Sequence, residues 1–158
     1  MKTTFIALAV ILMAFAPFAS NAQYNFPLAE LQKLTNKNAS DFETVVLGKD
    51  YSIQSKLSNQ VMKVYTSDKP GADGKQNTIS RYQVPNAMAK ITFCTTDKKY
   101  YLDLKSHLAA GGLKFVNEEN KTIEGVQAGC YNYTNGTLKV CLCSYTTDVT
   151  WYKVEVHL

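Results

Sequence analysis

Val126-Gln-Ala-Gly-Cys-Tyr-Asn-Tyr-Thr-Asn-Gly-Thr-Leu-Lys-Val-Cys-Leu-Cys-Ser-Tyr145 is the stretch that decides the fold, because it places a turn signal between two runs rich in β-formers. Its centre, Asn135-Gly136, is typical of a two-residue β-hairpin turn. Such a turn places Cys130 opposite Cys141 in the paired strands. Side chains two positions apart on a strand share a face, so Cys143 lies on the same face as Cys141. The stretch therefore predicts an antiparallel hairpin with three cysteines on one face.

The chain has four cysteines, and this hairpin limits the disulfide pairings that they can form. An even count favours a disulfide framework, and four cysteines allow three connectivities. We expect Cys130 to pair with either Cys141 or Cys143. Cys94, which ends another apolar run, should pair with the remaining one. Both alternatives stay open, because a slip in strand register exchanges them.

A metal site is the alternative interpretation of these cysteines. Cys130, Cys141 and Cys143 would offer soft sulfur ligands to zinc or copper, and His107 or His157 would complete the set. Zinc sites, however, usually use cysteines with two to four residues between them, and a Cys-x-Cys pair on a strand points both sulfurs the same way. A redox role lacks the Cys-x-x-Cys motif. We therefore expect structural disulfides and no metal.

Residues 1 to 22 have the layout of a cleavable signal peptide. Lys2 precedes an uncharged run over residues 5–16, and Pro17 breaks this run before the small-residue end Ser20-Asn21-Ala22. The run is too short for a transmembrane helix, which needs roughly 20 apolar residues. We expect cleavage after Ala22, a secreted or periplasmic protein, and no association with the membrane afterwards. Disulfides persist in such compartments.

The remaining residues, 23–158, have the length of a single domain. The whole chain carries 17 basic and 13 acidic residues, for a formal net charge of +4. Arg81 is its one arginine, the residue type best suited to bidentate phosphate contacts. A weakly basic chain of this composition lacks the dense cationic face of nucleic-acid-binding proteins, so we exclude nucleic acid as a partner.

Helical and strand patterns follow the same order in both halves. Apolar residues in 26–47 recur at spacings of three and four, which is typical of helices. Four β-rich runs follow, at 51–55, 61–66, 79–84 and 90–95. The second half has a helical pattern at 98–110 and then strands at 113–116, in both arms of the hairpin and at 150–158. We expect an α+β fold of two α-β-β-β-β units in tandem, at about 26–96 and 97–158, with an antiparallel sheet covered by helices on one face.

This order of elements resembles that of the beta-lactamase inhibitor protein family, whose members stack two helix-plus-four-strand units. The resemblance rests on the order of elements rather than on a sequence motif, and it covers the architecture. It implies an α+β domain, and it favours a role in which the protein masks another protein.

The sequence contains none of the common catalytic motifs. His107 and His157 are the available histidine bases, and His107 falls in the apolar rhythm of a helix. Glu118 and Glu119 are typical of a solvated link between strands. The loop at 67–77 has acidic residues beside glycines but lacks the spacing of a calcium-binding EF-hand. We therefore expect no enzyme activity and no cofactor.

Aromatic residues supply the candidate interface. Tyrosine offers a large contact area with a polar tip, which suits a protein-binding surface and equally a half-buried sheet. The candidate interface comprises Tyr65, Tyr82, Tyr131, Tyr133, Tyr145 and Trp151. We expect an exported, non-enzymatic protein-binding module, such as an inhibitor or immunity-type protein, with an unknown protein partner. The alternative is a small cysteine-based metal-binding or redox protein.

Overall fold

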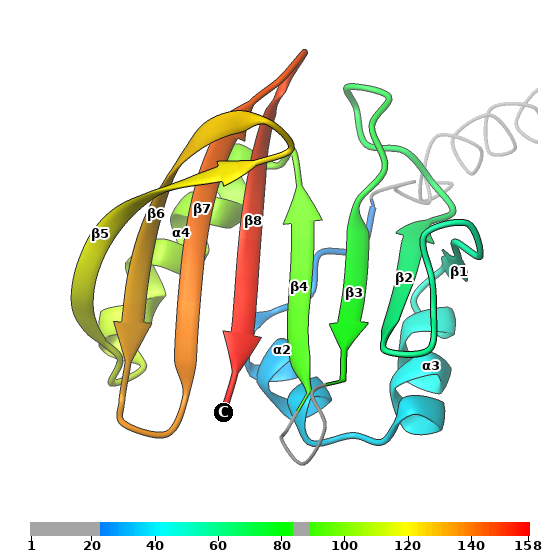
Figure 1. The fold of residues 1–158 in the computed structure, drawn as a ribbon, viewed down its shortest axis with the longest axis horizontal. Coiled ribbons are helices and arrows are strands. Elements are labelled where there is room, and N and C mark those ends of the chain that lie inside the picture. Colours follow the sequence, from blue (N-terminus) through cyan, green and yellow to red (C-terminus); the bar gives the residue numbers. More distant parts are fainter. Residues whose placement is uncertain (1–22, 84–88) are drawn as a thin grey trace, which may run out of the picture.

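The computed structural model describes residues 23–83 and 89–158, so the expected signal peptide at 1–22 lies outside the described residues. Three helices and eight strands form within them (Figure 1). The first half contains helices α2 (Leu28–Thr35) and α3 (Ala39–Leu47) and strands β1 (Tyr51–Ile53), β2 (Met62–Ser67), β3 (Thr78–Tyr82) and β4 (Lys90–Thr95). The second half contains α4 (Lys98–Ala110), β5 (Lys114–Ile123), β6 (Val126–Thr134), β7 (Lys139–Thr146) and β8 (Thr150–His157).

All eight strands belong to one antiparallel sheet, in the order β1-β2-β3-β4-β8-β7-β6-β5. The chain runs from one edge of the sheet to its centre through β1 to β4. Helix α4 follows, and the chain then continues at the opposite edge with β5 and returns to the centre, where β8 pairs with β4 (Figure 1). The expectation of an α+β fold with an antiparallel sheet is confirmed.

The main hydrophobic core joins the helices to the sheet. It includes buried residues of all three helices and alternate residues of the central strands, among them Leu31, Leu34, Phe42, Val46, Leu104, Leu108, Ile79, Ile91, Phe93, Val154 and Val156. Successive strand residues point to opposite faces. The residues between these core positions therefore form the other face of the sheet, which we call the cysteine face because it carries Cys94, Cys130, Cys141 and Cys143. In Figure 1 the helices lie behind the sheet.

Side-chain caps begin α3 and α4. The Asn38 Oδ1 atom accepts a hydrogen bond from the Asp41 amide at 2.8 Å, and the Asp97 Oδ1 atom accepts one from the Tyr100 amide at 2.9 Å. Such caps satisfy amides that have no partner within the helix. The other carboxylate oxygen of Asp97 accepts a hydrogen bond from Asn25 at 2.9 Å, which ties the N-terminal segment to the start of α4.

Strand β5 is longer than the sequence pattern predicts. Glu118 and Glu119, expected in a solvated link, both lie inside this strand. The strand ends at Ile123, and a two-residue turn of Glu124 and Gly125 leads into β6. Both turn residues have positive φ, 51° and 82°, as the tight hairpin turns that match strand twist require.

The end of the β5–β6 hairpin curves across the cysteine face, in front of β7 and β8 in Figure 1. Beneath it lies a second, smaller cluster of buried residues: Ala128, Cys130, Cys141, Cys143 and Tyr145. The side chains of Ile123, Val126 and Trp151 pack against this cluster. Part of the cysteine face is therefore covered by the sheet's own bent hairpin.

The β6–β7 hairpin has a different register from the predicted one. Cys130 lies opposite Cys143 rather than Cys141, and Thr134 lies opposite Lys139, so four residues connect the strands instead of two. The prediction that Cys130 faces Cys141 is wrong. Because the shift is an even number of residues, the three cysteines still share one face.

The Asn135 side chain explains the wider loop. Its Oδ1 atom accepts hydrogen bonds from the amides of Thr137 and Leu138, at 3.1 and 2.8 Å. The Asn135 amide in turn donates to the Leu138 carbonyl at 3.2 Å. An asparagine side chain that bonds to amides two and three residues ahead replaces the backbone bonds of a tighter turn.

Candidate sulfur site

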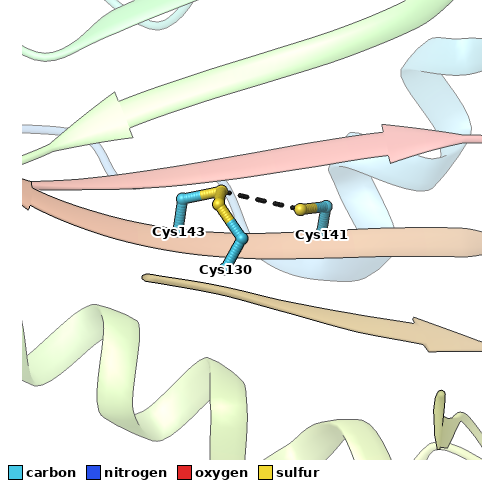
Figure 2. Close-up of side chains that lie close together, drawn as sticks. All are labelled: Cys130, Cys141 and Cys143. Atoms are coloured by element: carbon cyan, nitrogen blue, oxygen red, sulfur yellow. Dashed lines mark hydrogen bonds between the residues drawn. A yellow bond between two sulfur atoms is a disulfide. The ribbon is translucent and has the colours of Figure 1, made fainter. Parts of the chain in front are cut away.

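Three cysteine side chains meet on the cysteine face. Cys130 of β6 and Cys143 of β7 form a disulfide, and their Cα atoms are 4.1 Å apart. This separation is typical of antiparallel pairs that exchange no hydrogen bonds, in which side chains lie closest. The free thiol of Cys141 lies 3.6 Å from the Sγ atom of Cys143 (Figure 2). A disulfide and a free thiol are therefore in van der Waals contact.

Cys94 lies outside this cluster. It occupies β4 opposite Lys153 of β8, and Lys153 lies opposite Cys143 of β7. Neighbouring strands are about 4.8 Å apart, so the intervening strand puts the Cα atoms of Cys94 and Cys143 about 10 Å apart. A disulfide needs less than about 7 Å. The expected second disulfide does not form, and both Cys94 and Cys141 are free.

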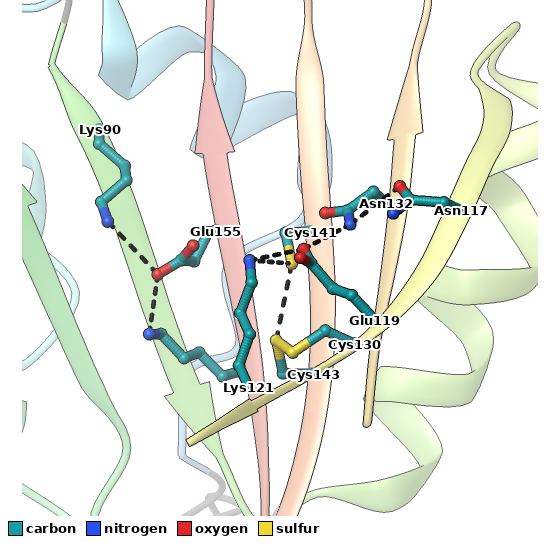
Figure 3. A network of polar contacts seen from close by, with 10 residues as sticks. Lys90, Asn117, Glu119, Lys121, Cys130, Asn132, Cys141, Cys143 and Glu155 are labelled. Carbon is teal, nitrogen blue, oxygen red and sulfur yellow. Dashed lines mark hydrogen bonds and ion pairs between the residues drawn. A yellow bond between two sulfur atoms is a disulfide. The ribbon is translucent and has the colours of Figure 1, made fainter. Parts of the chain in front are cut away.

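A lysine from the curved strand β5 reaches the free thiol. The Lys121 Nζ atom lies 3.8 Å from the Cys141 sulfur and 2.8 Å from the Glu119 carboxylate (Figure 3). Asn132 donates hydrogen bonds to Glu119 at 2.7 Å and to Asn117 at 3.2 Å. The carboxylate of Glu119 thus holds the ammonium group of Lys121 beside the sulfur.

A second charged group lies on the next strand. Glu155 of β8 is the cross-strand neighbour of Cys141. Its carboxylate pairs with Lys90 at 3.4 Å (Figure 3). It also pairs with Lys153 at 2.7 Å. Burial opposes ionisation of Glu155, but these two cations outweigh it and lower the pKa of its carboxyl group. The charged groups that act on the Cys141 thiol are therefore Lys121, Glu119 and Glu155, and Glu155 is itself paired with two lysines.

Burial and the lysine act in opposite directions on the Cys141 thiol. Burial raises its pKa, because the charged thiolate loses contact with water, and the Lys121 charge partly reverses this shift. The pKa of Cys94 is raised by burial to about 11, although Lys153 opposes the shift. Both thiols are therefore protonated at neutral pH.

A pocket of about 240 Å³ opens beside the free thiol. Residues of β5, β6, β7 and β8 line it, and Cys141, Lys139 and His157 are among them. Burial and the charge of Lys139 lower the pKa of His157. The pocket therefore brings a cysteine, a lysine and a histidine together in its lining.

The three cysteines are also the one group of potential metal ligands in the described parts of the chain, 23–83 and 89–158. The sulfur atoms of Cys130, Cys141 and Cys143 all lie within 4.8 Å of one another, and no histidine or carboxylate belongs to the group. His107 is exposed on α4, where its Nδ1 atom contacts the Asp103 carbonyl at 2.6 Å. The alternative in which His107 or His157 completes a metal-ligand set with the three cysteines has no support among these residues.

The six aromatic residues of the candidate interface do not form one surface. Tyr65 and Tyr145 are buried, with 1% and 5% of their surface exposed, whereas Tyr82 is 40% exposed. The other three are half-buried: Tyr131, Tyr133 and Trp151. Tyr65 belongs to the main core and Tyr145 to the cluster on the cysteine face, so the sheet itself separates them.

Lys121 and Glu119 are the site residues that sequence reasoning missed. Glu119 was interpreted as part of a solvated link and Lys121 was given no role, so no contact with a cysteine was expected of either. One signal was present in the sequence: Glu124-Gly125 stands between the apolar residues Ile123 and Val126, which is typical of a tight hairpin turn. A hairpin turn at Glu124-Gly125 implies that the preceding strand includes Glu119 and Lys121.

Comparison with known proteins gave no match, whether with family models, curated proteins or solved structures. Among the residues that the structure describes, none of the helices has the length and apolar character needed to cross a membrane.

Proposed function

We propose that this protein is an exported thiol–disulfide protein in which the Cys141 thiol exchanges with the Cys130–Cys143 disulfide. The observation that carries the proposal is the 3.6 Å contact between the Cys141 and Cys143 sulfur atoms. Disulfides rearrange when a thiolate attacks one of their sulfur atoms. A third cysteine in contact with a disulfide meets the first requirement of that reaction.

The exchange conserves atoms and electrons. The Cys141 thiol gives up its proton, and its sulfur attacks the Sγ atom of Cys143. A Cys141–Cys143 bond forms while the Cys130–Cys143 bond breaks, and Cys130 leaves as a thiolate that takes up a proton. No oxidant or reductant is consumed. The ammonium group of Lys121, 3.8 Å from the attacking sulfur, stabilises the thiolate form.

The two disulfide forms differ in the separation of their Cα atoms. Residues two apart on a strand have Cα atoms about 6.7 Å apart, which is close to the roughly 6.8 Å upper end of the disulfide range. The cross-strand pair Cys130–Cys143, at 4.1 Å, lies just below the roughly 4.4 Å lower end of that range. Because the structure holds the Cys130–Cys143 bond, we expect the rearranged Cys141–Cys143 bond to be the minor form. It is the form that would pass a disulfide to the thiol of another exported molecule.

We also propose that the protein is exported and that its chain consists of two structural units. The signal-like segment at 1–22 and the disulfide both support a location outside the cytoplasm. Each half of the chain has helical residues followed by four antiparallel strands, and the halves meet where β4 pairs with β8. These features support units at about 26–96 and 97–158. A protein-binding module has less support, because its six aromatic residues are dispersed.

Peptide mapping tests the exchange directly. Trypsin cleavage after Lys121, Lys139 and Lys153 places Cys130 on one peptide and both Cys141 and Cys143 on another. The full-length chain is expressed, and the protein is purified after export, incubated at pH 9 without metal, alkylated in denaturant and digested. We expect a fraction of the Cys130 peptide to be alkylated, together with a Cys141–Cys143 disulfide inside the second peptide.

Two serine variants serve as controls. Cys141→Ser removes the attacking sulfur and should leave every Cys130 peptide cross-linked. Cys94→Ser removes the other free thiol and should give the wild-type pattern. Uncatalysed disulfide rearrangement takes minutes to hours. Wild-type protein that shows the Cys130–Cys143 cross-link alone after a day at pH 9 would rule out the exchange.

A further inference from the structure

We infer that the reduced protein binds one Cu(I) ion through the three sulfur atoms of Cys130, Cys141 and Cys143. The inference goes beyond thiol–disulfide exchange, because it concerns the state in which a dithiol reductant has supplied two electrons and two protons to the Cys130–Cys143 disulfide. That state holds three thiols on one face of two adjacent strands (Figure 2). Binding of the ion then displaces the three thiol protons.

The spacing of the sulfur atoms fits a three-coordinate ion. A metal–sulfur bond of about 2.3 Å, with three ligands in one plane, puts the sulfur atoms about 4 Å apart. The Cys141 and Cys143 atoms are already 3.6 Å apart, and all three lie within 4.8 Å of one another. Reduction frees Cys130 and Cys143 to separate to the same distance by small side-chain rotations. The backbone of both strands can stay in place.

The ligand set favours Cu(I) over zinc. Thiolates are soft ligands that select Cu(I) and zinc, but structural zinc sites almost always have four ligands. No fourth cysteine, histidine or carboxylate of the described residues belongs to the group. Cys94, the remaining cysteine, lies beyond strand β8. Cu(I), a closed-shell ion, accepts three thiolates.

The surroundings offset the charge of such a complex. Three thiolates and one Cu(I) carry a net charge of two minus. The Lys121 ammonium group lies 3.8 Å from the Cys141 sulfur (Figure 3). Lys153 is the cross-strand neighbour of Cys143. Burial among Tyr145, Ala128 and the curved hairpin keeps bulk water from the sulfur atoms. Charged groups around the ligands and the exclusion of water from the sulfur atoms both tune metal affinity.

The experiment titrates Cu(I) into the protein reduced with a phosphine, under anaerobic conditions, against a chromogenic Cu(I) chelator. We expect one ion per chain, and X-ray absorption should show three sulfur neighbours at about 2.3 Å. Cys141→Ser should weaken binding by at least about 100-fold, and Lys121→Met by about 10-fold. Cys94→Ser should bind as the wild type does. Oxidised wild-type protein, with one cluster thiol left, should not compete with the chelator.

Several results would overturn the inference: equal binding by the oxidised protein, no loss in Cys141→Ser, or an X-ray spectrum with two sulfur neighbours. Stronger retention of zinc than of Cu(I) would also overturn it. Circular dichroism of each reduced variant shows whether weak binding reflects an unfolded chain, and Lys121→Met tests the site with all three sulfurs present. The peptide map is made without metal, so failure of the exchange leaves copper binding separately measurable.

Discussion

The hydroxyl groups of Tyr100 and Tyr101, consecutive residues of α4, differ in their hydrogen bonding. The Tyr100 hydroxyl donates to the Phe26 carbonyl at 2.7 Å. The Tyr101 hydroxyl is buried and has no hydrogen-bond partner among the described residues, while its ring stacks on Tyr152 with the centroids 4.7 Å apart. Leaving a buried polar group without a partner costs about 1–3 kcal/mol.

Phenylalanine substitutions at these two positions should therefore have opposite effects. Tyr101→Phe keeps the stacked ring and removes the unpaired hydroxyl, so we expect the free energy of unfolding to rise by about 1 kcal/mol. Tyr100→Phe removes a made hydrogen bond and should lower it by about 1 kcal/mol. Urea denaturation of both variants measures the difference. Equal losses would show that the Tyr101 hydroxyl has a partner after all.

The Cys130–Cys143 disulfide should account for a large share of the stability. It joins residues 13 apart in the sequence, and closing a loop of about that length is worth about 3 kcal/mol. Replacing both cysteines with alanine should lower the free energy of unfolding by about this amount. A single substitution is less informative, because it leaves a partner that can pair with Cys141. The matched control is Cys94→Ala, and an equal loss in the control would contradict the assignment.

Asp148 should titrate at unusually low pH. It lies in the β7–β8 turn and pairs with Lys75 of the β2–β3 loop, and the hydrogen bond from Lys75 is the main reason that its pKa falls to about 2. The ordinary value is about 3.9. Since the folded pKa is the lower one, the ion pair stabilises the fold above about pH 4 and is lost as pH falls through about 2.

Carbon NMR of the Asp148 carboxyl group measures this titration. Lys75→Met should raise the pKa toward the ordinary value, and Lys69→Met, a change in the same loop, should leave it unchanged. Both partners face water, so we expect little change in overall stability. If the pKa of Asp148 is the same with and without Lys75, the two loops do not make this contact.

The cysteine cluster could be predicted in part. The face of the sheet on which a residue lies is easier to predict than the residue that lies opposite it on the next strand. Side chains alternate between the two faces along β6 and β7. Cys130, Cys141 and Cys143 therefore stay on one face when the pairing of the two strands shifts by two residues. The partner of Cys130 was not predictable from the Asn-Gly pair, because the Asn135 side chain forms its own turn and lengthens the loop. Side-chain bonds of this kind compete with backbone turns and leave no separate trace in the sequence pattern.

The isolation of Cys94 was beyond local reasoning for a different reason. The strand that separates it from the cluster is β8, the last in the chain, which inserts between β4 and β7. Strands that follow one another in the chain pair most often, and a prediction from strand patterns assumes such pairing. The pairing of β4 with β8 instead joins segments about 60 residues apart in the chain. Hydrophobic alternation on a strand indicates which of its faces is buried, but it does not indicate which strand lies beside it.

Cys94 itself gives a last prediction about thiol reactivity. Burial raises the pKa of its thiol to about 11, so its thiolate fraction at pH 8 is more than about 100-fold below that of an ordinary cysteine. We expect Ellman's reagent to find two thiols per chain in guanidinium but to react slowly with the native protein at pH 8. The rate for Cys94 in the Cys141→Ser variant should rise about tenfold per pH unit toward pH 11. Two fast thiols in the native state would contradict the raised pKa of Cys94. No thiols in guanidinium would mean that Cys94 and Cys141 had paired, which the position of β8 between their strands forbids in the fold described above.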